Sequence, residues 1–462
     1  MQSDKAVDAT VLNQDKPFND QFLLKQFLNV AGPTVMMGWL AAIFFVVDGI
    51  FIGRFIGPDA LAASNLALPI LVLPFAFGIM ISVGGSTRCA VLLGQGKFLE
   101  AAAIFTQATW LVMIGGSLIG LMFYFMADSI AYVLGARDHI HTMAANYLRY
   151  YSFFQPFVII AFTFEAFLRL ENAARVGMYA MGAAALANIG LDYFLIVTCG
   201  LGMKGSALAT GITLSLSGLA MLMYHVLRAN HLKLIRRAFS RFKQEITTIL
   251  YLGLSEFLSQ IAPMAVIASF NFAVLNWIGK DGLVAYTILD QTIMIGTITL
   301  IALMQSMQSM VSYFFGAEKR VEMMRCVAIG CSFIIGFSLL LALMVVFAAK
   351  PLTVIYLGKN IQEIWHHLEF ATKWYGLALI PGGINLVVLG YLTAIQAPTK
   401  STIIALLRSW IILLIALWTL PAFFGAQAIW LVILITELAT LPVSLILLRF
   451  TKIKWSSTAQ LA

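Results

Sequence analysis

The stretch Leu66–Ile81 reads LALPILVLPFAFGIMI and contains no charged residue. Phe333–Ala349, which reads FIIGFSLLLALMVVFAA, is a second stretch of the same kind. Of the 462 residues, 61% are hydrophobic and only 11% are charged, against roughly 25% charged in an ordinary soluble domain. A backbone that crosses hydrocarbon must bond within helices or closed barrels. Because these runs are too apolar for alternating barrel strands, the sequence predicts an all-α membrane protein.

Apolar stretches separated by Gly, Pro and charged residues predict twelve transmembrane helices. Their approximate centres are Ile43, Leu73, Ile114, Ile159, Ala185, Leu216, Val266, Thr297, Leu339, Leu379, Ile411 and Val432. Of the 29 Lys and Arg residues, 20 fall in loops on the side of the N-terminus, 6 in the opposite loops and 3 within or near spans. Since basic loops stay inside, we expect a multi-pass protein of the plasma membrane (the bacterial inner membrane) with both termini cytoplasmic.

The net charge of +8 is explained by these loops, so we expect the lipid bilayer as a partner and no nucleic acid. The four cysteines, Cys89, Cys199, Cys326 and Cys331, form no CxxC pair, which predicts single thiols without a disulfide or metal site. A complete phosphate-binding loop, an HExxH motif and a GxSxG motif are all missing from the sequence. The sequence therefore predicts no enzyme and no cofactor.

An internal repeat appears when the chain is shifted by 222 residues, because Ile56–Ala63 then aligns without gaps with Ile278–Ala285. Gly94 and Lys97 meet Gly316 and Lys319 at the same offset. In both copies an aspartate, Asp59 or Asp281, follows a Gly turn and is predicted to cap the next helix. The shared turn glycines and charges favour a true duplication over chance similarity between apolar helices.

The duplication predicts two six-helix lobes related by a pseudo-two-fold axis along the membrane normal. We expect a cytoplasmic N-terminal segment (1–20), an N-lobe with spans 1 to 6 (21–229), a basic cytoplasmic linker (230–243), a C-lobe with spans 7 to 12 (244–452) and a cytoplasmic tail (453–462). Duplicated halves with a site between them are typical of secondary transporters.

Asp48 is the outstanding charged residue within a span, in the stretch Phe44–Ile50. A charge inside a membrane costs several kcal/mol, so such a residue is a functional candidate. A lone carboxyl in low dielectric resists ionisation, which suits the uptake and release of a proton. The alternative is an interfacial aspartate that reaches the outer water near Arg54. We favour the functional interpretation.

Asn188 and Asp192 lie four residues apart in the fifth span and so share one helix face. An amide beside a carboxyl can bond either protonation state or help to coordinate a cation; a polar pair that packs helices together is the alternative. Thr210, in the sixth span, and Tyr147, at the start of the fourth, could add hydroxyl groups.

The second half carries Glu256, Asp290 and Glu437 in its seventh, eighth and twelfth spans. Glu256 and Asp290 are secondary candidates, which either line a cavity or extend toward water. Glu165 lies four residues before Arg169, so an ion pair within the helix is predicted for it. Three glycines at every fourth position, Gly49, Gly53 and Gly57, are predicted to let helices pack closely.

These motifs resemble those of the multidrug and toxic compound extrusion (MATE) family of transporters, prokaryotic type. The similar segments are Val47–Gly49 with Gly53, Gly57 and Ala60–Ala63, then Leu168–Asn172, Ala187–Tyr193 and Gly202–Thr210. The likeness extends over essentially the whole chain. It implies a monomeric antiporter that exports amphipathic, often cationic, small organic compounds against protons or sodium, by alternating access of two lobes. It also implies an ion-coupling site at Asp48, Asn188, Asp192, Thr210 and Tyr147, where sodium could bind between Asp48 and Asp192.

Two other functions are open. A flippase for lipid-linked saccharides, from the same superfamily, would need cationic side chains for a pyrophosphate, and Arg149, Lys373 and Arg408 are the candidates within or near spans. A channel or receptor is the alternative of another class, although channels form more naturally by symmetric assembly around a filter.

Overall fold

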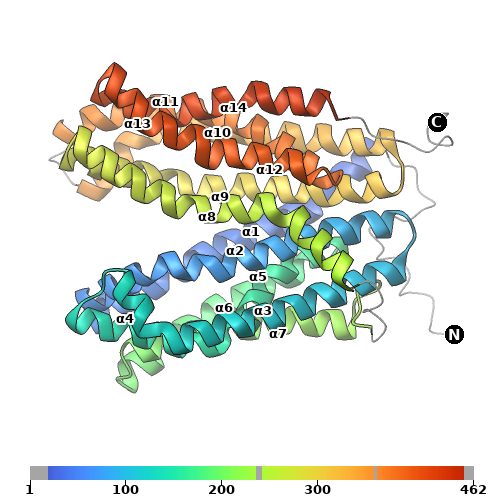
Figure 1. Cartoon of the computed structure of the whole chain (residues 1–462), viewed down its shortest axis with the longest axis horizontal. Helices are drawn as coiled ribbons and strands as arrows, with labels where there is room; N and C mark the ends of the chain where they lie inside the picture. The colour runs from blue at the N-terminus through green and yellow to red at the C-terminus, as the bar shows by residue number, and fades with distance from the viewer. Residues whose placement is uncertain (1–18, 236–241, 358–361, 452–462) are drawn as a thin grey trace. The chain divides into compact units, whose positions relative to one another are not determined.

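The computed structural model describes residues 19–235, 242–357 and 362–451, and over these ranges its regular structure is entirely helical (Figure 1). Twelve helices in this part of the chain are long and apolar enough to cross a membrane. Each of the twelve predicted centres falls within one of them. The predicted all-α fold with twelve spans is therefore confirmed.

The first six spans are built from seven α-helices and three short turns. They are α1 (Asp20–Phe51), the π-helical turn η1 (Ile52–Ile56), α2 (Pro58–Gly94), α3 (Phe98–Val133), α4 (Asp138–Tyr151), the 3₁₀ turn η2 (Ser152–Phe154), α5 (Gln155–Leu170), α6 (Ala174–Asp192), the π-helical turn η3 (Tyr193–Thr198) and α7 (Met203–Leu227).

The last six spans are built from seven α-helices and two short turns. They are α8 (Phe242–Trp277), α9 (Lys280–Gly316), α10 (Arg320–Leu357), α11 (Gln362–Ala394), α12 (Pro398–Leu406), the π-helical turn η4 (Leu407–Ile411), α13 (Ile412–Phe424), the 3₁₀ turn η5 (Ala426–Leu431) and α14 (Val432–Arg449).

The chain forms two compact units. Leu28–Gly253 belong to the first, whereas Asp20–Phe27 and the residues from Leu254 onward belong to the second. The predicted lobe boundaries stay a prediction. Most of the predicted segment 1–20, part of the linker 230–243 and the tail 453–462 lie outside the described residues.

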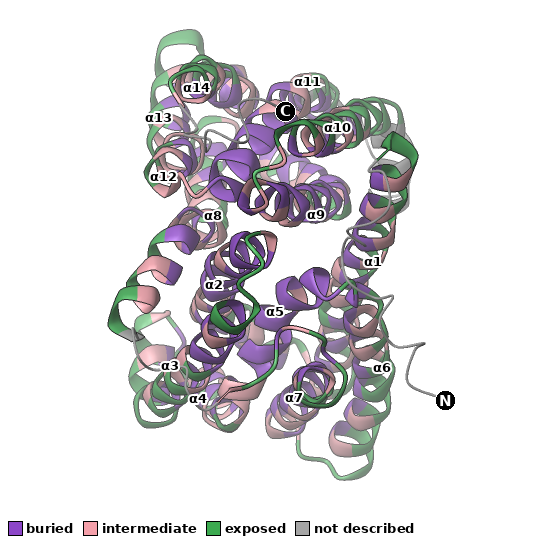
Figure 2. Cartoon of the chain, turned by 90° about the vertical axis from the view of Figure 1, so that its right-hand side faces the viewer, coloured by how far each residue is buried: buried purple, intermediate pink, exposed green. Residues whose placement is uncertain are grey.

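Corresponding spans of the two halves are buried to a similar extent, except that the sixth is 61% buried and the twelfth 33%. The second and eighth spans are each 50% buried, and the fourth and tenth are each 67% buried. The first and seventh are each only 22% buried. This recurrence supports the duplication that the 222-residue offset indicates. Figure 2 shows the contrast within the first unit, where α5 is largely buried and α6 keeps a long exposed face.

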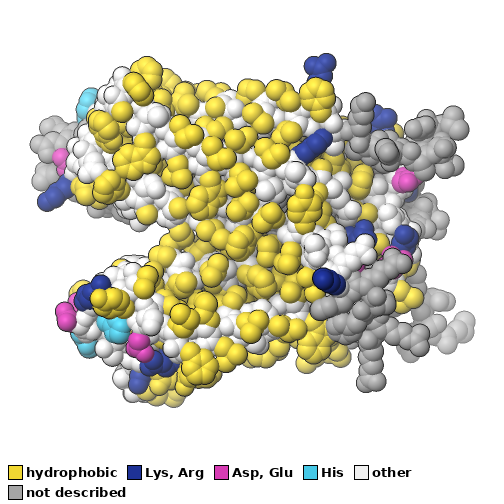
Figure 3. All heavy atoms as spheres, viewed as in Figure 1, with side chains coloured by type: hydrophobic (Ala, Val, Ile, Leu, Met, Phe, Trp, Pro, Cys, Tyr) yellow, Lys and Arg dark blue, Asp and Glu magenta, His cyan; other side chains and the backbone are white. Residues whose placement is uncertain are grey.

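The outward faces of the helices are apolar. Hydrophobic side chains cover most of the face in Figure 3, and the charged side chains gather toward its ends. Leu118, Phe125 and Phe347 are examples, and all three are more than 60% exposed. In water such a surface would be unfavourable, whereas hydrocarbon solvates it.

Asp59 and Asp281 are not helix caps, which corrects the sequence prediction. The helices α2 and α9 each begin one residue before the aspartate, at Pro58 and Lys280. Gly57 and Gly279 precede the two helices, with φ angles of 130° and 103°. Both aspartates therefore lie in the first helical turn, where a negative charge is still favourable toward the helix dipole. For α2 the early start follows from Pro58, whose fixed φ suits the first helical position.

The close packing predicted for three glycines holds for one of them. A Cβ atom on Gly53 would lie 3.3 Å from Cδ2 of Leu61, so this glycine does permit a close approach. A Cβ atom on Gly49 would meet nothing within 4 Å. Gly57 serves the chain turn instead, through its positive φ. The prediction was wrong for Gly49 and Gly57 because even spacing alone does not say which positions face a neighbour.

Candidate functional site

Asp48 lies in the interior of the first unit, near the end of α1, and is only 5% exposed. Its Oδ1 atom accepts two hydrogen bonds, from Thr210 Oγ1 at 3.1 Å and from Ser206 Oγ at 3.2 Å. The structure therefore favours a buried carboxyl over an interfacial one beside Arg54, whose side chain is exposed.

Ser206 and Thr210 reach Asp48 together because both lie on α7, one helical turn apart. The chain enters α7 through Gly200 and Gly202, which have φ angles of 65° and 54°. Only glycine adopts such angles readily, so this pair allows the tight turn between η3 and α7. The turn places both hydroxyls on the face of α7 that meets α1.

Asn188 and Asp192 lie on α6, and both are fully buried at 0% exposure. The Asn188 amide lies beside the Asp192 carboxyl and stabilises its charge. None of the four polar atoms of these two side chains has a hydrogen-bond partner elsewhere in the described structure. The Asp192 carboxyl is near enough to Asp48 for the two charges to interact. Buried polar atoms are normally paired, so four such atoms beside a second carboxyl mark a place where a proton, an ion or water completes the bonding.

Two tyrosines of α4 complete this side of the unit. The rings of Tyr147 and Tyr151 stack with centroids 5.9 Å apart. Both phenols interact electrostatically with Asp48, and Tyr147 also lies beside Thr210. All five predicted coupling residues, Asp48, Tyr147, Asn188, Asp192 and Thr210, are thus buried in one unit, and the interactions given above link them.

Both carboxyls stand next to a π-helical turn. Asp48 precedes η1 by four residues, and Asp192 is the last residue of α6 before η3. The two turns also pack against each other. Turns of this kind frequently occur at functional sites, because the wider hydrogen-bond spacing changes the direction of the side chains around them.

The site offers only oxygen and amide groups to a ligand. Carboxylate, hydroxyl and carbonyl oxygens suit a proton or a hard cation, whereas softer transition metals prefer sulfur and imidazole ligands. Among the described residues, no three His, Cys, Asp or Glu side chains gather as a metal site. Two carboxyls with hydroxyl and amide neighbours therefore fit a proton or a hard cation.

The secondary candidates of the second unit have separate surroundings. Glu256, on α8, is buried, and the charge of Arg408 acts on it. Asp290, on α9, interacts with Tyr286 and Tyr375. Each carboxyl thus has its own polar neighbours.

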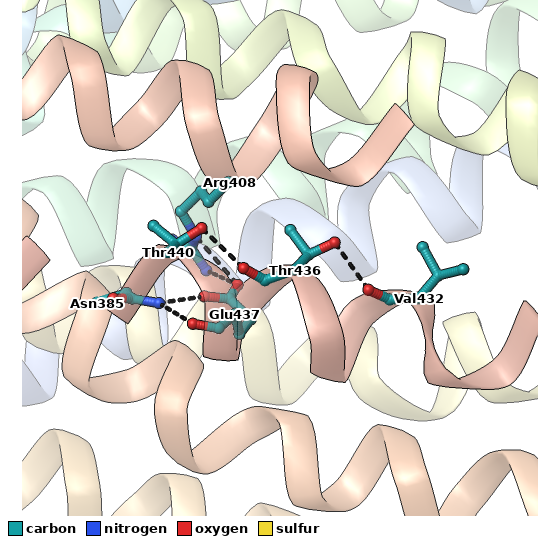
Figure 4. A network of polar contacts seen from close by, with 6 residues as sticks. All are labelled: Asn385, Arg408, Val432, Thr436, Glu437 and Thr440. Atoms are coloured by element: carbon teal, nitrogen blue, oxygen red, sulfur yellow. Dashed lines mark hydrogen bonds and ion pairs between the residues drawn. The ribbon is translucent and has the colours of Figure 1, made fainter. Parts of the chain in front are cut away.

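A polar network at α11, η4 and α14 surrounds Glu437 (Figure 4). Arg408 donates to Glu437 Oε1 from Nη2 at 2.7 Å and from Nε at 3.1 Å. Asn385 Nδ2 donates to Glu437 Oε2 at 2.8 Å and to the main-chain oxygen of Glu437 at 2.9 Å. Both carboxylate oxygens are therefore bonded, which is the arrangement that lets a charged pair persist inside a protein.

Sequence reasoning missed Ser206, Tyr151, Asn385 and the partner of Arg408. A usable signal existed for Ser206, since it lies four residues before Thr210 on the same helix face. For Asn385, no neighbouring residue of the sequence signals a contact 52 residues away. The predicted ion pair between Glu165 and Arg169 is present, at 2.9 Å.

Known proteins resemble this chain along nearly its whole length. The multidrug export protein MepA of Staphylococcus aureus is 26% identical over 443 residues, which cover 93% of this chain and 94% of the relative. Among solved structures, a MOP superfamily transporter from Pyrococcus furiosus superposes with a TM-score of 0.85 at 20% identity, covering 94% of this chain and 98% of the other. The MATE transporter VcmN of Vibrio cholerae, in its bent form, also reaches 0.85 at 20% identity, over 93% and 97% of the two chains. Both solved structures therefore have the same fold as this chain.

A family model described as MatE matches residues 33–194 and 252–419. The first segment includes Asp48, Tyr147, Asn188 and Asp192, and the second includes Glu256, Asp290 and Arg408. The two matched segments also correspond to the two copies of the internal repeat. Since they make up more than half of the 462 residues, this chain belongs to the MatE family, the multidrug and toxic compound extrusion transporters that its motifs resemble.

Proposed function

We propose that this transporter exports amphipathic, often cationic, organic compounds by antiport against protons or sodium. The single observation that carries the proposal is the pair of buried carboxyls, Asp48 and Asp192, within one hydroxyl- and amide-lined site of the first unit. The staphylococcal relatives, which are named multidrug export proteins, support the substrate class.

The charge balance of the site explains why it would exchange cations. The bonded neighbours of Asp48 are the hydroxyls of Ser206 and Thr210, which stabilise a charge without neutralising it. Two ionised carboxyls in low dielectric are costly, so a proton or a monovalent cation is needed between them. We assign this coupling role to Asp48, Asn188, Asp192, Thr210 and Tyr147, and we keep Glu256 and Asp290 as secondary candidates.

Exchange follows if the ion and the organic compound favour different arrangements of the two lobes. Each ligand then weakens the binding of the other by the same factor, because coupling between two sites is reciprocal. We further propose that both termini are cytoplasmic, in line with the excess of basic residues in the loops on that side. All the coupling residues come from one chain, so we propose that a monomer is sufficient.

The flippase alternative receives little support from the side chains that it requires. Arg149 pairs with Asp128, Lys373 with Glu369 and Arg408 with Glu437. Binding of a pyrophosphate by Arg408 would leave the buried Glu437 carboxylate uncompensated. Arg149 and Lys373 belong to exposed pairs, which are held only weakly.

Export from proteoliposomes tests the proposal. A proton gradient and a sodium gradient are imposed separately, and a fluorescent organic cation is followed with wild type and with Asp48→Asn. We expect export under one of the two gradients, which names the coupling ion, and at least tenfold slower export in the variant. Asp59→Asn is the matched control, because Asp59 is exposed in the first turn of α2.

Two results would count against the proposal. Folded protein that exports under neither gradient would argue for the flippase. Undiminished export by Asp48→Asn would keep antiport but move the coupling site to Asp192 or to Asp290.

A further inference from the structure

The hydroxyl of Ser206 does not make the hydrogen bond that a helical serine usually makes. Buried Ser and Thr side chains in helices commonly donate to the carbonyl oxygen one turn earlier. On the same helix, Thr213 does so, since its Oγ1 donates to the Ala209 oxygen at 2.7 Å. Ser206 donates instead to Asp48, on a helix 158 residues away in the sequence. The side chain is fully buried, so this bond is shielded from competing water.

Ser206 and Thr210 both donate to the same oxygen of Asp48. The distances to Oδ1 are 3.2 Å and 3.1 Å, and neither hydroxyl donates to Oδ2. The two carboxyl oxygens are therefore chemically different. An oxygen that accepts two hydrogen bonds is the poorer base of the two, so a proton adds to the other one.

From this geometry we propose that Ser206 is a positioning residue of the coupling site, and that with Thr210 it holds Asp48 by Oδ1 so that Oδ2 is the oxygen that takes up and releases a proton. The inference rests on the exchange function proposed above. It assigns the exchange to the Oδ2 atom of Asp48 and adds Ser206 to the five predicted coupling residues.

The bonding remains complete in both states of the carboxyl. When Asp48 is ionised, Oδ1 accepts both hydroxyl hydrogen bonds as a carboxylate oxygen. When a proton arrives from water, an O–H bond forms at Oδ2 and Oδ1 becomes the carbonyl oxygen, which still accepts both bonds. The proton leaves by breaking that same O–H bond. The other titratable groups that interact with Asp48 are Asp192 on α6 and Tyr147 and Tyr151 on α4.

Infrared spectroscopy of the whole protein in lipid tests this assignment without any transport. Acid-minus-alkaline difference spectra contain the carbonyl bands of protonated carboxyls, and the band that disappears in Asp48→Asn belongs to Asp48. A hydrogen bond to a carbonyl oxygen lowers its stretching frequency. We therefore expect the Asp48 band to move to higher frequency in Ser206→Ala and to return toward its original position in Ser206→Thr.

Ser217→Ala is the matched control. It is the same substitution on the same helix, and the buried Ser217 hydroxyl has no hydrogen-bond partner in the described structure. The Asp48 band should stay in place. In export assays we expect Ser206→Ala to be about tenfold slower, the loss of one hydrogen bond to a charged group, and Ser206→Thr to recover most of the rate.

The outcomes separate the inference from the function on which it rests. An Asp48 band that does not move in Ser206→Ala would overturn the inference, because Oδ1 would not then be the carbonyl oxygen, whatever the export assay gives. A band that moves as expected in a protein without antiport would support the assignment and reject the function. If no band disappears in Asp48→Asn, Asp48 takes up no proton and the inference fails.

Discussion

Glu437 is a buried carboxylate whose charge is balanced by one side chain, Arg408. Figure 4 shows that Asn385 completes its bonding from α11. Gly382, on the same helix, lies against the carboxylate, since a Cβ atom there would be in van der Waals contact with Cδ of Glu437 at 3.4 Å. The removal of one member of such a group is costlier than the removal of the whole pair, because a charge is left without its partner.

Glu437→Gln should therefore destabilise the protein by about 2 kcal/mol, less than for a fully buried pair because the Arg408 side chain is 24% exposed. Thermal unfolding in detergent measures the effect as a lower Tm. The double variant Glu437→Gln with Arg408→Gln should regain part of the loss. A Tm equal to that of wild type in the single variant would contradict this account.

Single residues differ in how far the sequence alone predicts them. Asp48 could be found because a charge within an apolar stretch is costly and thus conspicuous. The spacing from Thr210 makes Ser206 a candidate, but Thr213 also lies within one turn of Thr210, so the sequence does not separate the two. Ser206 donates to Asp48 on another helix, whereas Thr213 donates to the backbone of its own helix. That choice depends on which side chain faces α1, and this follows from packing.

At the scale of elements, the start of the connection between the two halves is bound to the first unit by one carboxylate. Glu171, which follows α5, accepts hydrogen bonds from the backbone N–H groups of Asn230, His231 and Leu232, at 2.8, 3.0 and 2.6 Å. His225 adds a bond to the Leu232 oxygen at 3.0 Å. A segment that the sequence predicts as a plain basic linker thus begins as an anchored one.

Glu171→Gln should release this segment. A glutamine has a single acceptor oxygen, and its NH₂ group would face backbone donors. We expect trypsin to cleave after the exposed Lys233 about tenfold faster, because the loss of charge-assisted hydrogen bonds makes local opening easier.

Gel analysis of timed digests measures this rate. Glu100→Gln is the control, because Glu100 is exposed at the start of α3. Equal cleavage rates in the Glu171 variant and in wild type would show that the carboxylate does not anchor the segment.

At the scale of the whole molecule, two helices each pass from one compact unit to the other. The first turns of α8 belong to the first unit as far as Gly253, and the first turns of α1 belong to the second unit as far as Phe27. Within the first unit, a Cβ atom on Gly84 of α2 would collide with the Ile249 carbonyl oxygen of α8. Within the second, Arg325 pairs with Asp20 at 3.4 Å.

A covalent bridge within one unit should leave export intact. Arg88 and Glu245, an ion pair of the first unit at 3.3 Å, can both be replaced by cysteine in a protein without its four native cysteines. We expect the protein bridged by a short bis-maleimide to keep at least half of its export rate in proteoliposomes. The same double variant, left unbridged, is the control. Export abolished by the bridge would mean that the start of α8 moves relative to α2 during transport.

The sequence predicts the twelve spans well because hydrocarbon demands long apolar helices, and a hydropathy pattern records that demand directly. It does not predict where one unit ends and the other begins. Both α1 and α8 continue across that boundary as unbroken helices, so no loop marks it. Long-range contacts such as the one between Gly84 and Ile249 decide it, and no local pattern encodes them.

The π-helical turns η1 and η3 determine where a span of this chain can lose a residue and remain helical. A π-helical turn spaces its hydrogen bonds one residue wider than an α-helix, so it holds a residue that a regular helix would not. The removal of one residue from Ile52–Ile56 would leave a continuous α-helix, and the end of this span would rotate by about 100° relative to Asp48. The first span can therefore lose one residue just after its carboxyl and remain helical. Over generations such a change can rotate the loop that follows and leave Asp48 bonded to α7.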